Sequence, residues 1–365
     1  MKITTIVGAR PQFVKAAVVS RAIKRYNESN SGNPIQETII HTGQHFDDNM
    51  SDVFFREMDI PRPDHHLNLG GGTHGQMTGR MLEAIEGVYM DNTPDWVLVY
   101  GDTNSTLAGA LAAAKLHIPV AHVESGLRSY NRKMPEEINR ILTDHAATLC
   151  FAPTDQAVSN LVGEGIAEST IARVGDVMQD AMIFYRGLAS KQETIVDQLK
   201  LSPKSFILAT AHRAENTDDP GRLAGIIDGL AQLAQDLPVI LPLHPRTRNK
   251  LNEFGLMERA KSTLTLIDPV GYMDMVMLEA NAALIATDSG GVQKEAYFNQ
   301  VPCLTLRDET EWTELLDAGV NRLVGADPDA IAAQGRDMLG NSIPAGTLYG
   351  DGQAAEAIIA KLIES

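Results

Sequence analysis

Short apolar runs rich in β-branched residues alternate with helix-length amphipathic segments along almost the whole chain. Segments 11–26, 103–117 and 222–235 have the length and apolar spacing of helices. Continuous apolar runs between helices are typical of parallel strands that are buried on both faces. The alternation therefore predicts an α/β fold built on parallel sheets. The expected strands are ITTIV, ETIIHTG, WVLVYGD, PVAHVES, TLCFAPT and IARVGD, then SFILATAH, PVILPLH, LTLIDP, ALIATDS, PCLTL and RLVG.

The strand pattern divides the chain into two similar halves. About six strand–helix units lie on each side of residue ~180, and 365 residues are enough for two domains of common size. We expect two doubly wound, Rossmann-like domains, 1–176 and 177–352, with a final helix at 353–365 that packs back onto the first. A long polar helix over roughly 177–199 would join them. Because ligands bind at the carboxyl ends of strands in such sheets, the chemistry is expected in a central cleft that the domains face.

Composition limits the partners of the chain. The net charge of −16 argues against a nucleic-acid or anionic-membrane partner, since both need a positive surface. The sequence contains no run of ~18 apolar residues, so no membrane span is expected. The N-terminus enters a strand directly, without a leader. Cys150 and Cys303 lie in apolar runs and are interpreted as buried thiols. We therefore expect a cytoplasmic protein without a metal site.

The stretch 283–306 has the pattern strand–loop–helix–strand. Its loop places Ser289, Gly290 and Gly291 before a helix that is expected to begin near Val292. Free N–H groups and the positive end of the helix dipole favour an anion there. Glu295, about one turn into the helix, is at the right depth to accept hydrogen bonds from sugar hydroxyls. The loop is either a nucleotide-diphosphate cradle or an ordinary glycine turn of an α/β protein.

A second set of cations follows the first strand. Gly8-Ala9-Arg10-Pro11-Gln12 lacks the GxGxxG spacing of a dinucleotide fold, so no nicotinamide cofactor is expected. Arg10 and Lys15 at a helix start suit a phosphate. The alternative is two solvated surface cations.

Three carboxylates occupy strand ends or helix starts in the first half. Asp102 follows WVLVYG, where a single Asp most often caps the next helix. Glu124 follows PVAHV, and a carboxylate directly after a buried strand is costly without a partner. Glu136 lies in a Pro-Glu-Glu helix start that requires no function, yet it shares a helix face with Arg140.

The second half adds His212 and Arg213 after the strand SFILAT, and His244 after PVILPL. A strand-end histidine is more often structural than catalytic, but here a His-Arg pair would face three carboxylates. Carboxylates that are desolvated when a cleft closes acquire raised pKa values, and they can then act as acids or bases near neutral pH. These residues favour proton transfer on a nucleotide-linked substrate.

Taken together, these residues resemble the non-hydrolysing UDP-N-acetylglucosamine 2-epimerases over nearly the whole chain. The resemblance implies a glycosyltransferase-B-like fold, a homodimer, no cofactor, a UDP-sugar substrate and a role in bacterial surface polysaccharide synthesis. Its landmarks are Gly8–Pro11 with Lys15, Gln44-His45, Gly101-Asp102-Thr103, the stretches HVESGLR (122–128) and PEEINR (135–140), HRAEN (212–216), DSGGVQKEA (288–296) and YGDG (349–352).

The resemblance also implies roles for individual residues. A base removes the C2 proton of the sugar as UDP departs from C1, and UDP then re-adds with a proton delivered to the opposite face. Asp102, Glu124 and Glu136 are the implied acid/base groups, and which one serves which face stays open. The implied ligands of the diphosphate are Arg10, Lys15, His212, Ser289 and Gly290, that of the ribose is Glu295, and Arg140 would orient the carboxylates. Arg213, Gly291 and Arg307 complete the expected substrate-binding set, with His212 also in a catalytic role.

Several departures point to a subgroup. Gln12-Phe13 replaces an acidic-then-small pair, Lys294 stands where a glutamate is common, and segment 71–80 lacks an arginine that many bacterial members use in a regulatory site. The pattern is more similar to the epimerases of UDP-2,3-diacetamido-2,3-dideoxy-glucuronate. The extra carboxylate of that substrate would suit the cationic loop that contains Arg128, Arg132 and Lys133. The alternative is a solvated basic loop.

Three other functions fit parts of the pattern. A UDP-sugar glycosyltransferase of the same architecture is the closest alternative, because fold does not fix function. It would need an acceptor site and would typically use fewer carboxylates in its cleft. A hydrolysing epimerase would release UDP stoichiometrically, and an inactive nucleotide-sugar sensor would not need all three carboxylates and His212.

Overall fold

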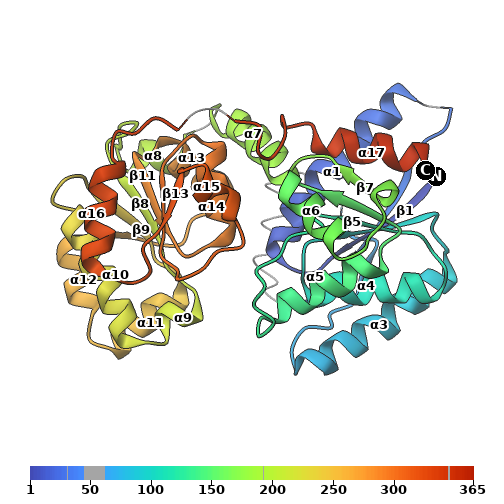
Figure 1. Cartoon of the computed structure of the whole chain (residues 1–365), viewed down its shortest axis with the longest axis horizontal. Helices are drawn as coiled ribbons and strands as arrows, with labels where there is room; N and C mark the ends of the chain where they lie inside the picture. The colour runs from blue at the N-terminus through green and yellow to red at the C-terminus, as the bar shows by residue number, and fades with distance from the viewer. Residues whose placement is uncertain (31, 45–61, 192, 344–345) are drawn as a thin grey trace. The chain divides into compact units, whose positions relative to one another are not determined.

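The computed structural model describes residues 1–30, 32–44, 62–191, 193–343 and 346–365. The chain forms two compact units, shown in Figure 1: Met1–Ala181 with Thr347–Ser365 make the first, and Met182–Gly346 make the second. Each unit is a parallel sheet covered by helices on both faces, so the predicted α/β class with two doubly wound units is confirmed.

Within its described residues, the first unit has a seven-stranded sheet of order β3-β2-β1-β4-β5-β6-β7. Figure 1 shows α1 and α17 on one face of this sheet and α3, α4 and α5 on the other. The strands are β1 Lys2–Val7, β2 Gln36–His41, β3 His65–His66, β4 Trp96–Tyr100, β5 Val120–Val123, β6 Leu149–Ala152 and β7 Ile171–Arg173. The helices are α1 Arg10–Ser29, α3 His74–Asp91, α4 Asn104–Lys115, α5 Pro135–Ala146, α6 Asp155–Gly163, the short η1 Glu168–Thr170, and α17 Ala354–Glu364.

The second unit has a six-stranded sheet of order β10-β9-β8-β11-β12-β13 in its described part. The strands are β8 Ile207–Thr210, β9 Val239–Pro242, β10 Thr265–Ile267, β11 Leu284–Thr287, β12 Cys303–Thr305 and β13 Asn321–Leu323. The helices are α8 Ile195–Gln198, α9 Ala214–Thr217, α10 Pro220–Leu233, α11 Pro245–Glu253, α12 Met257–Thr263, α13 Tyr272–Asn281, α14 Gly290–Phe298, α15 Thr313–Asp317 and α16 Pro328–Met338. Helix α7, Val177–Ala189, runs from the first unit into the second.

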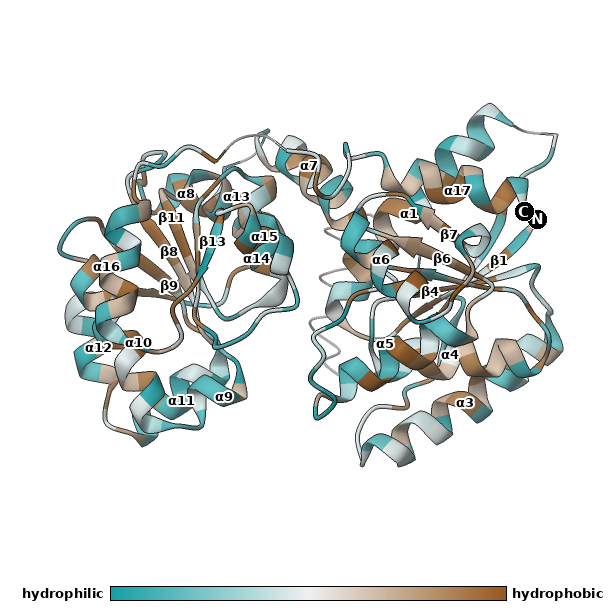
Figure 2. Ribbon diagram, in the orientation of Figure 1, coloured by the Kyte–Doolittle hydropathy of each residue, from teal (hydrophilic) through white to brown (hydrophobic). Residues whose placement is uncertain are grey.

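Apolar strands sandwiched between amphipathic helices create the core of each unit, and Figure 2 shows β8, β9 and β11 of the second unit in the brown of hydrophobic residues. In the second unit, one core layer packs α10 and α16 on the sheet, and the other packs α13 and α14 on its opposite face. Burial on both faces explains why these strands are continuous apolar runs rather than alternating ones.

Two details of the predicted fold are wrong. The expected helix over 177–199 is two helices, because α7 ends at Ala189 and α8 begins at Ile195. Thr194 starts α8 by donating from both N and Oγ1 to Asp197 Oδ2 at 2.9 Å. Strand β3 was not expected, since His65-His66 is not an apolar run. It forms by pairing with β2 at Ile40 and His41.

Candidate active site

The strand order places two loops of each unit at a topological switch point. In the first unit β1 pairs with β2 on one side and β4 on the other, so the chain reverses direction across the sheet there. In the second unit β8 lies between β9 and β11 in the same way. Ligands of open α/β sheets bind at the carboxyl ends of such strands. The predicted site residues follow β1, β4, β5, β8 and β11, except Arg307, which follows β12.

A pocket of about 180 Å³ opens at this point in the first unit. It brings together Lys15, Asp102 and Glu136, three of the residues expected from the sequence. The lining residues are Ala9, Pro11, Gln12, Lys15, Gln44, His74, Tyr100, Gly101, Asp102, Thr103, Asn104, Pro135, Glu136 and Asn139.

Glu124 lies next to this pocket and forms an ion pair with Lys15, and both side chains are about nine-tenths buried. The carboxylate after the buried strand β5 therefore has the partner that its burial requires. Glu124 has a φ of +69°, which costs a residue with a side chain about 1–2 kcal/mol. Gly101 makes room for the pair, because a Cβ there would lie 3.1 Å from Lys15 Nζ and 3.3 Å from Glu124 Oε2.

Asp102 is not a helix cap. The N-cap of α4 is Thr103, whose side chain accepts a hydrogen bond from Thr106 N. The Asp102 carboxylate instead forms an ion pair with Arg140, which also donates to Glu137 Oε2 at 3.0 Å. The more common capping role considered for Asp102 is therefore wrong, and α5 supplies the cation that fixes its carboxylate.

Glu136 is in the first turn of α5, and its side chain is exposed within the pocket wall. Its neighbour Glu137 is buried and accepts hydrogen bonds from Ser129 and Tyr130 as well as from Arg140. The two adjacent acids of the helix start therefore differ in environment. Glu137 is bonded to its own unit, and Glu136 faces the pocket.

A buried histidine–aspartate pair lies behind both loops, and sequence reasoning gave it no role. His122 contacts Asp144 Oδ1 through Nδ1 at 2.6 Å and the Gly101 carbonyl through Nε2 at 2.7 Å. Asp144 also accepts from Gly126 N at 3.1 Å. Burial would raise the pKa of Asp144, but His122 and Arg128 outweigh it and hold that pKa below its usual range. The pair ties the loop after β4 to the turn after β5.

Gln12 acts as a structural link between the loops. Its Oε1 accepts from the backbone of Gly8 and Ala9 at 2.8 and 3.0 Å, and its Nε2 donates to Tyr100 O and Thr106 Oγ1 at 2.8 and 2.9 Å. The residue that departs from the usual family pattern therefore connects the loop after β1 to the end of β4 and to α4.

Arg128 is buried and fully engaged. It forms ion pairs of 2.7 Å with both Asp144 and Glu164, so it is not an open cation for a substrate carboxylate. Arg132 and Lys133 of the same loop are exposed. The expectation of three cations available together in this loop is wrong at Arg128.

In the second unit, Asp288 joins the loops after β8 and β11. Its buried carboxylate accepts from the backbone N–H groups of His212 and Arg213 at 2.9 and 3.0 Å and from Asn216 Nδ2 at 3.1 Å. Ser289 is the N-cap residue of α14, and its side chain makes no capping bond. The structure therefore brings His212 and Arg213 beside the N-terminus of the helix that carries Gly290 and Gly291.

Glu311 and Arg307 complete this cluster. Arg307 is buried and donates to Glu311 Oε2 at 2.8 Å. Burial would raise the pKa of Glu311, but the charge of Arg307 lowers it below its usual range. A Cβ on Gly290 would lie 2.5 Å from Glu311 Oε1, so a larger residue there would displace this carboxylate. Glu311 was not expected from the sequence.

Glu295 is almost completely buried on α14. It interacts with Glu279 of α13, whose pKa is raised well above its usual range by burial and by the charge of Glu295. The Tyr272 hydroxyl also lies against Glu295.

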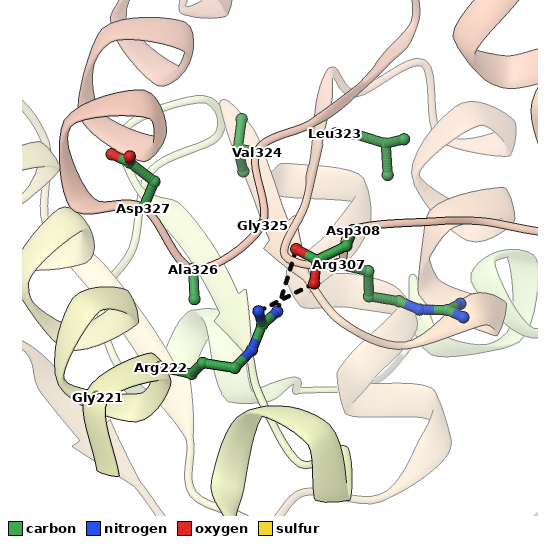
Figure 3. A pocket seen from close by; sticks show the side chains of 9 residues that line it. All are labelled: Gly221, Arg222, Arg307, Asp308, Leu323, Val324, Gly325, Ala326 and Asp327. Atoms are coloured by element: carbon green, nitrogen blue, oxygen red, sulfur yellow. Dashed lines mark hydrogen bonds and ion pairs between the residues drawn. The ribbon is translucent and has the colours of Figure 1, made fainter. Parts of the chain in front are cut away.

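A larger pocket of about 550 Å³ lies in the second unit, beside Arg307 and Asp308. Figure 3 shows the Arg222–Asp308 ion pair across it and the Arg307 guanidinium directed away from that pair. Arg307 is the one predicted site residue among its lining residues. We therefore place the candidate site at the switch points and not in this pocket.

Some expectations lie outside what is described. The side chain of Arg10, at the start of α1, and the whole of His45 are outside the described residues. In the described part of the chain, Cys150 and Cys303 are buried free thiols, and no cluster of His, Cys, Asp or Glu is arranged to hold a metal. No helix among the described residues is long and apolar enough to cross a membrane.

Two α/β units, with acids at the switch point of one and a glycine-containing helix N-terminus at that of the other, are typical of nucleotide-sugar enzymes of the glycosyltransferase-B-like class. The sequence family described as UDP-N-acetylglucosamine 2-epimerase matches residues 27–363, and the chain belongs to it.

Individual relatives match over nearly their full length. The UDP-2,3-diacetamido-2,3-dideoxy-D-glucuronate 2-epimerase of Pseudomonas aeruginosa is 53% identical over 362 residues, covering 98% of each chain. The UDP-N-acetylglucosamine 2-epimerase of Methanocaldococcus jannaschii is 44% identical, again over 98% of each chain. The crystal structure of the M. jannaschii enzyme in complex with UDP-GlcNAc and UDP matches 100% of both chains, with a TM-score of 0.89 at 44% identity.

Proposed function

We propose that the chain catalyses non-hydrolysing epimerisation at C2 of a UDP-linked 2-acetamido sugar. A base removes the C2 proton, the electrons of that bond form a C1=C2 double bond, and the C1–O electron pair leaves with UDP. UDP then adds back to C1 as an acid delivers a proton to the opposite face of C2. Atoms balance without water, oxidant or cofactor, and two acid/base groups are needed.

The pocket of the first unit carries this proposal. Asp102 and Glu124 are each held by a buried cation, and Glu136 is exposed in the pocket wall, so three carboxylates are available within one small site. We assign these three residues as the acid/base groups and Arg140 as the residue that orients Asp102. Proton transfer by positioned groups of this kind contributes about 10²–10⁴-fold to rate.

The second unit is proposed to hold the nucleotide. Gly290 and Gly291 offer backbone N–H groups, and Ser289 its hydroxyl, at the start of α14, where the helix dipole favours the diphosphate. Arg213 and Arg307 would add positive charge, His212 would donate a hydrogen bond, and Glu295 would accept from the ribose hydroxyls. Arg10 and Lys15 are proposed diphosphate ligands from the first unit. Departing UDP develops negative charge that such groups stabilise.

We infer that the substrate is UDP-2,3-diacetamido-2,3-dideoxy-glucuronate. The support is the 53% identity with the P. aeruginosa enzyme of that name over 98% of both chains. Relatives named for UDP-N-acetylglucosamine include the M. jannaschii enzyme at 44% identity and a Methanococcus maripaludis homolog at 54% over 91% of this chain, so the assay below decides between the two sugars. UDP-GlcNAc is the second candidate, favoured by the structural match to the M. jannaschii complex with that sugar. We also propose that the chain acts in the cytoplasm as a homodimer, for which light scattering should give twice the mass of one chain.

The test is incubation of the chain with each UDP-sugar in heavy water and no acceptor. The proposal expects deuterium at C2, both C2 epimers, and no stoichiometric release of UDP. A sugar recovered without deuterium would favour the glycosyltransferase alternative, and stoichiometric UDP would indicate a hydrolysing epimerase. Faster turnover of UDP-GlcNAc than of the diacetamido uronate would remove the substrate assignment.

A further inference from the structure

His74 is a pocket residue to which the sequence analysis gave no role. It is the first residue of α3, directly after the N-cap Thr73, and its side chain is exposed. It lines the 180 Å³ pocket together with Lys15, Asp102 and Glu136. An imidazole in that position faces the same ligand as the proposed acid/base groups.

Hydrogen bonds to buried amides determine which nitrogen of His74 carries the proton. The carbonyl oxygen of Asp102 can only accept, so Asn139 donates to it from Nδ2 at 2.9 Å. The same Nδ2 group also donates to Asn104 Oδ1 at 3.1 Å. The Nδ2 group of Asn104 therefore faces His74 Nδ1, at 3.2 Å. Because an amide NH₂ group only donates, Nδ1 of His74 must accept.

The chain of hydrogen bonds consequently fixes a neutral imidazole with its proton on Nε2. Asn104 and Asn139 are both buried, with 6% of each residue exposed, so the fold fixes which group donates and which accepts in this series of hydrogen bonds. In the described part of the structure Nε2 has no protein hydrogen-bond partner. The pocket thus contains a hydrogen-bond donor, His74 Nε2–H, that is held in place and that donates to no other described residue.

We propose that His74 Nε2–H donates a hydrogen bond to an acceptor oxygen on the sugar of the UDP-sugar and is a specificity-determining residue. The acceptor is the carbonyl of an acetamido group or the ring carboxylate. This inference rests on the proposed function and deepens it. A donor held in advance disfavours a sugar that lacks the acceptor, because the His74 N–H would lose its water without gaining a hydrogen bond when that sugar binds.

The test compares His74→Phe, which keeps a ring but removes the donor, with His74→Gln, which restores an N–H near the same position. His65→Phe on β3 is the matched control, because His65 is not among the residues that line the pocket. Initial rates with both UDP-sugars give kcat and KM, competitive inhibition gives the affinity for UDP, and thermal melts verify folding. We expect His74→Phe to raise KM about tenfold with kcat nearly unchanged, the signature of lost uniform binding.

UDP lacks the acetamido sugar that His74 is proposed to contact, so the affinity of His74→Phe for UDP should stay within twofold of wild type. His74→Gln and His65→Phe should keep KM within about threefold. A rise in KM for both sugars identifies the shared 2-acetamido group as acceptor, and a rise for the diacetamido uronate alone identifies its 3-acetamido group or carboxylate. An unchanged KM in His74→Phe, or UDP binding weakened as much as sugar binding, overturns the inference. Inactivity of the wild type on both sugars overturns the proposed function itself.

Discussion

Gly101→Ala tests whether the position of the Lys15–Glu124 ion pair matters for activity. Gly101 follows β4, and its N–H donates to Val123 O at 3.0 Å. Its φ of +62° lies in the left-handed region, where a residue with a Cβ is about 1–2 kcal/mol less stable. The new Cβ would also lie 3.1 Å from Lys15 Nζ and 3.3 Å from Glu124 Oε2. The substitution therefore adds a local steric effect to a backbone effect.

These two effects have different sizes and different consequences. The backbone strain should lower the free energy of unfolding by about 1–2 kcal/mol. The crowded atoms are the ends of side chains, so they move by a few tenths of an ångström at little further cost in stability. Misplacement by 1 Å costs about 10² in rate, so a shift of this size should lower kcat roughly tenfold.

Gly165→Ala is the matched control. Gly165 has a φ of +87°, and nothing lies within 4 Å of a Cβ added there, so only the backbone effect remains. Denaturant unfolding should show a similar loss of stability in both variants, whereas kcat should fall only in Gly101→Ala. Wild-type kcat in Gly101→Ala, or an equal loss in Gly165→Ala, would refute the reasoning.

Three further predictions concern single side chains. Asp102→Asn should lower kcat by about 10²–10⁴ without changing the Kd of UDP measured by calorimetry, and a kcat near wild type would remove Asp102 from the acid/base set. Glu295→Gln should raise the Kd of UDP tenfold or more, because a hydrogen bond to a charged group contributes about 1.5–3 kcal/mol; an unchanged Kd would contradict the ribose role. Burial raises the pKa of Asp180 to about 6 although Ala354 and Ala355 donate to it, so the folded chain holds this proton more tightly than the unfolded chain. The free energy of unfolding should therefore fall by about 2–3 kcal/mol as pH rises from ~4 to 6. Denaturant melts should show a smaller fall with pH in Asp180→Asn than in wild type, and an equal fall in both would contradict this.

The sequence was sufficient to predict the strands that are buried on both faces of a sheet. All twelve expected apolar runs contain a strand, because a continuous β-branched run between helices has few other ways to be buried. Strand β3 could not be found this way, since pairing with β2 and not its own propensity makes His65-His66 extended. The break before α8 depends on the bonds between Thr194 and Asp197, a capping signal that the amphipathic pattern obscured.

The site was predictable only as positions along the chain. A residue after a buried strand must lie at the carboxyl edge of the sheet, so Asp102 and Glu124 could be placed there. Their partners could not, because Lys15 is far from Glu124 in sequence and Arg140 is far from Asp102. The same holds for the contact of His122 with Asp144, in which a strand residue meets a helix residue.

The energetics of the first unit support the site independently of any resemblance. A buried ion pair is a weak stabiliser, because desolvation offsets most of its attraction. Glu124 carries such a pair and a left-handed backbone at the same residue, and Gly101 has the small size and the φ that accommodate the pair. By contrast, the Arg25–Glu356 pair between α1 and α17 is half-exposed and costs little desolvation. Backbone strain and buried charge together at Glu124, beside the pocket, fit the acid/base role that we propose for this residue, because stability alone would be better served by apolar packing there.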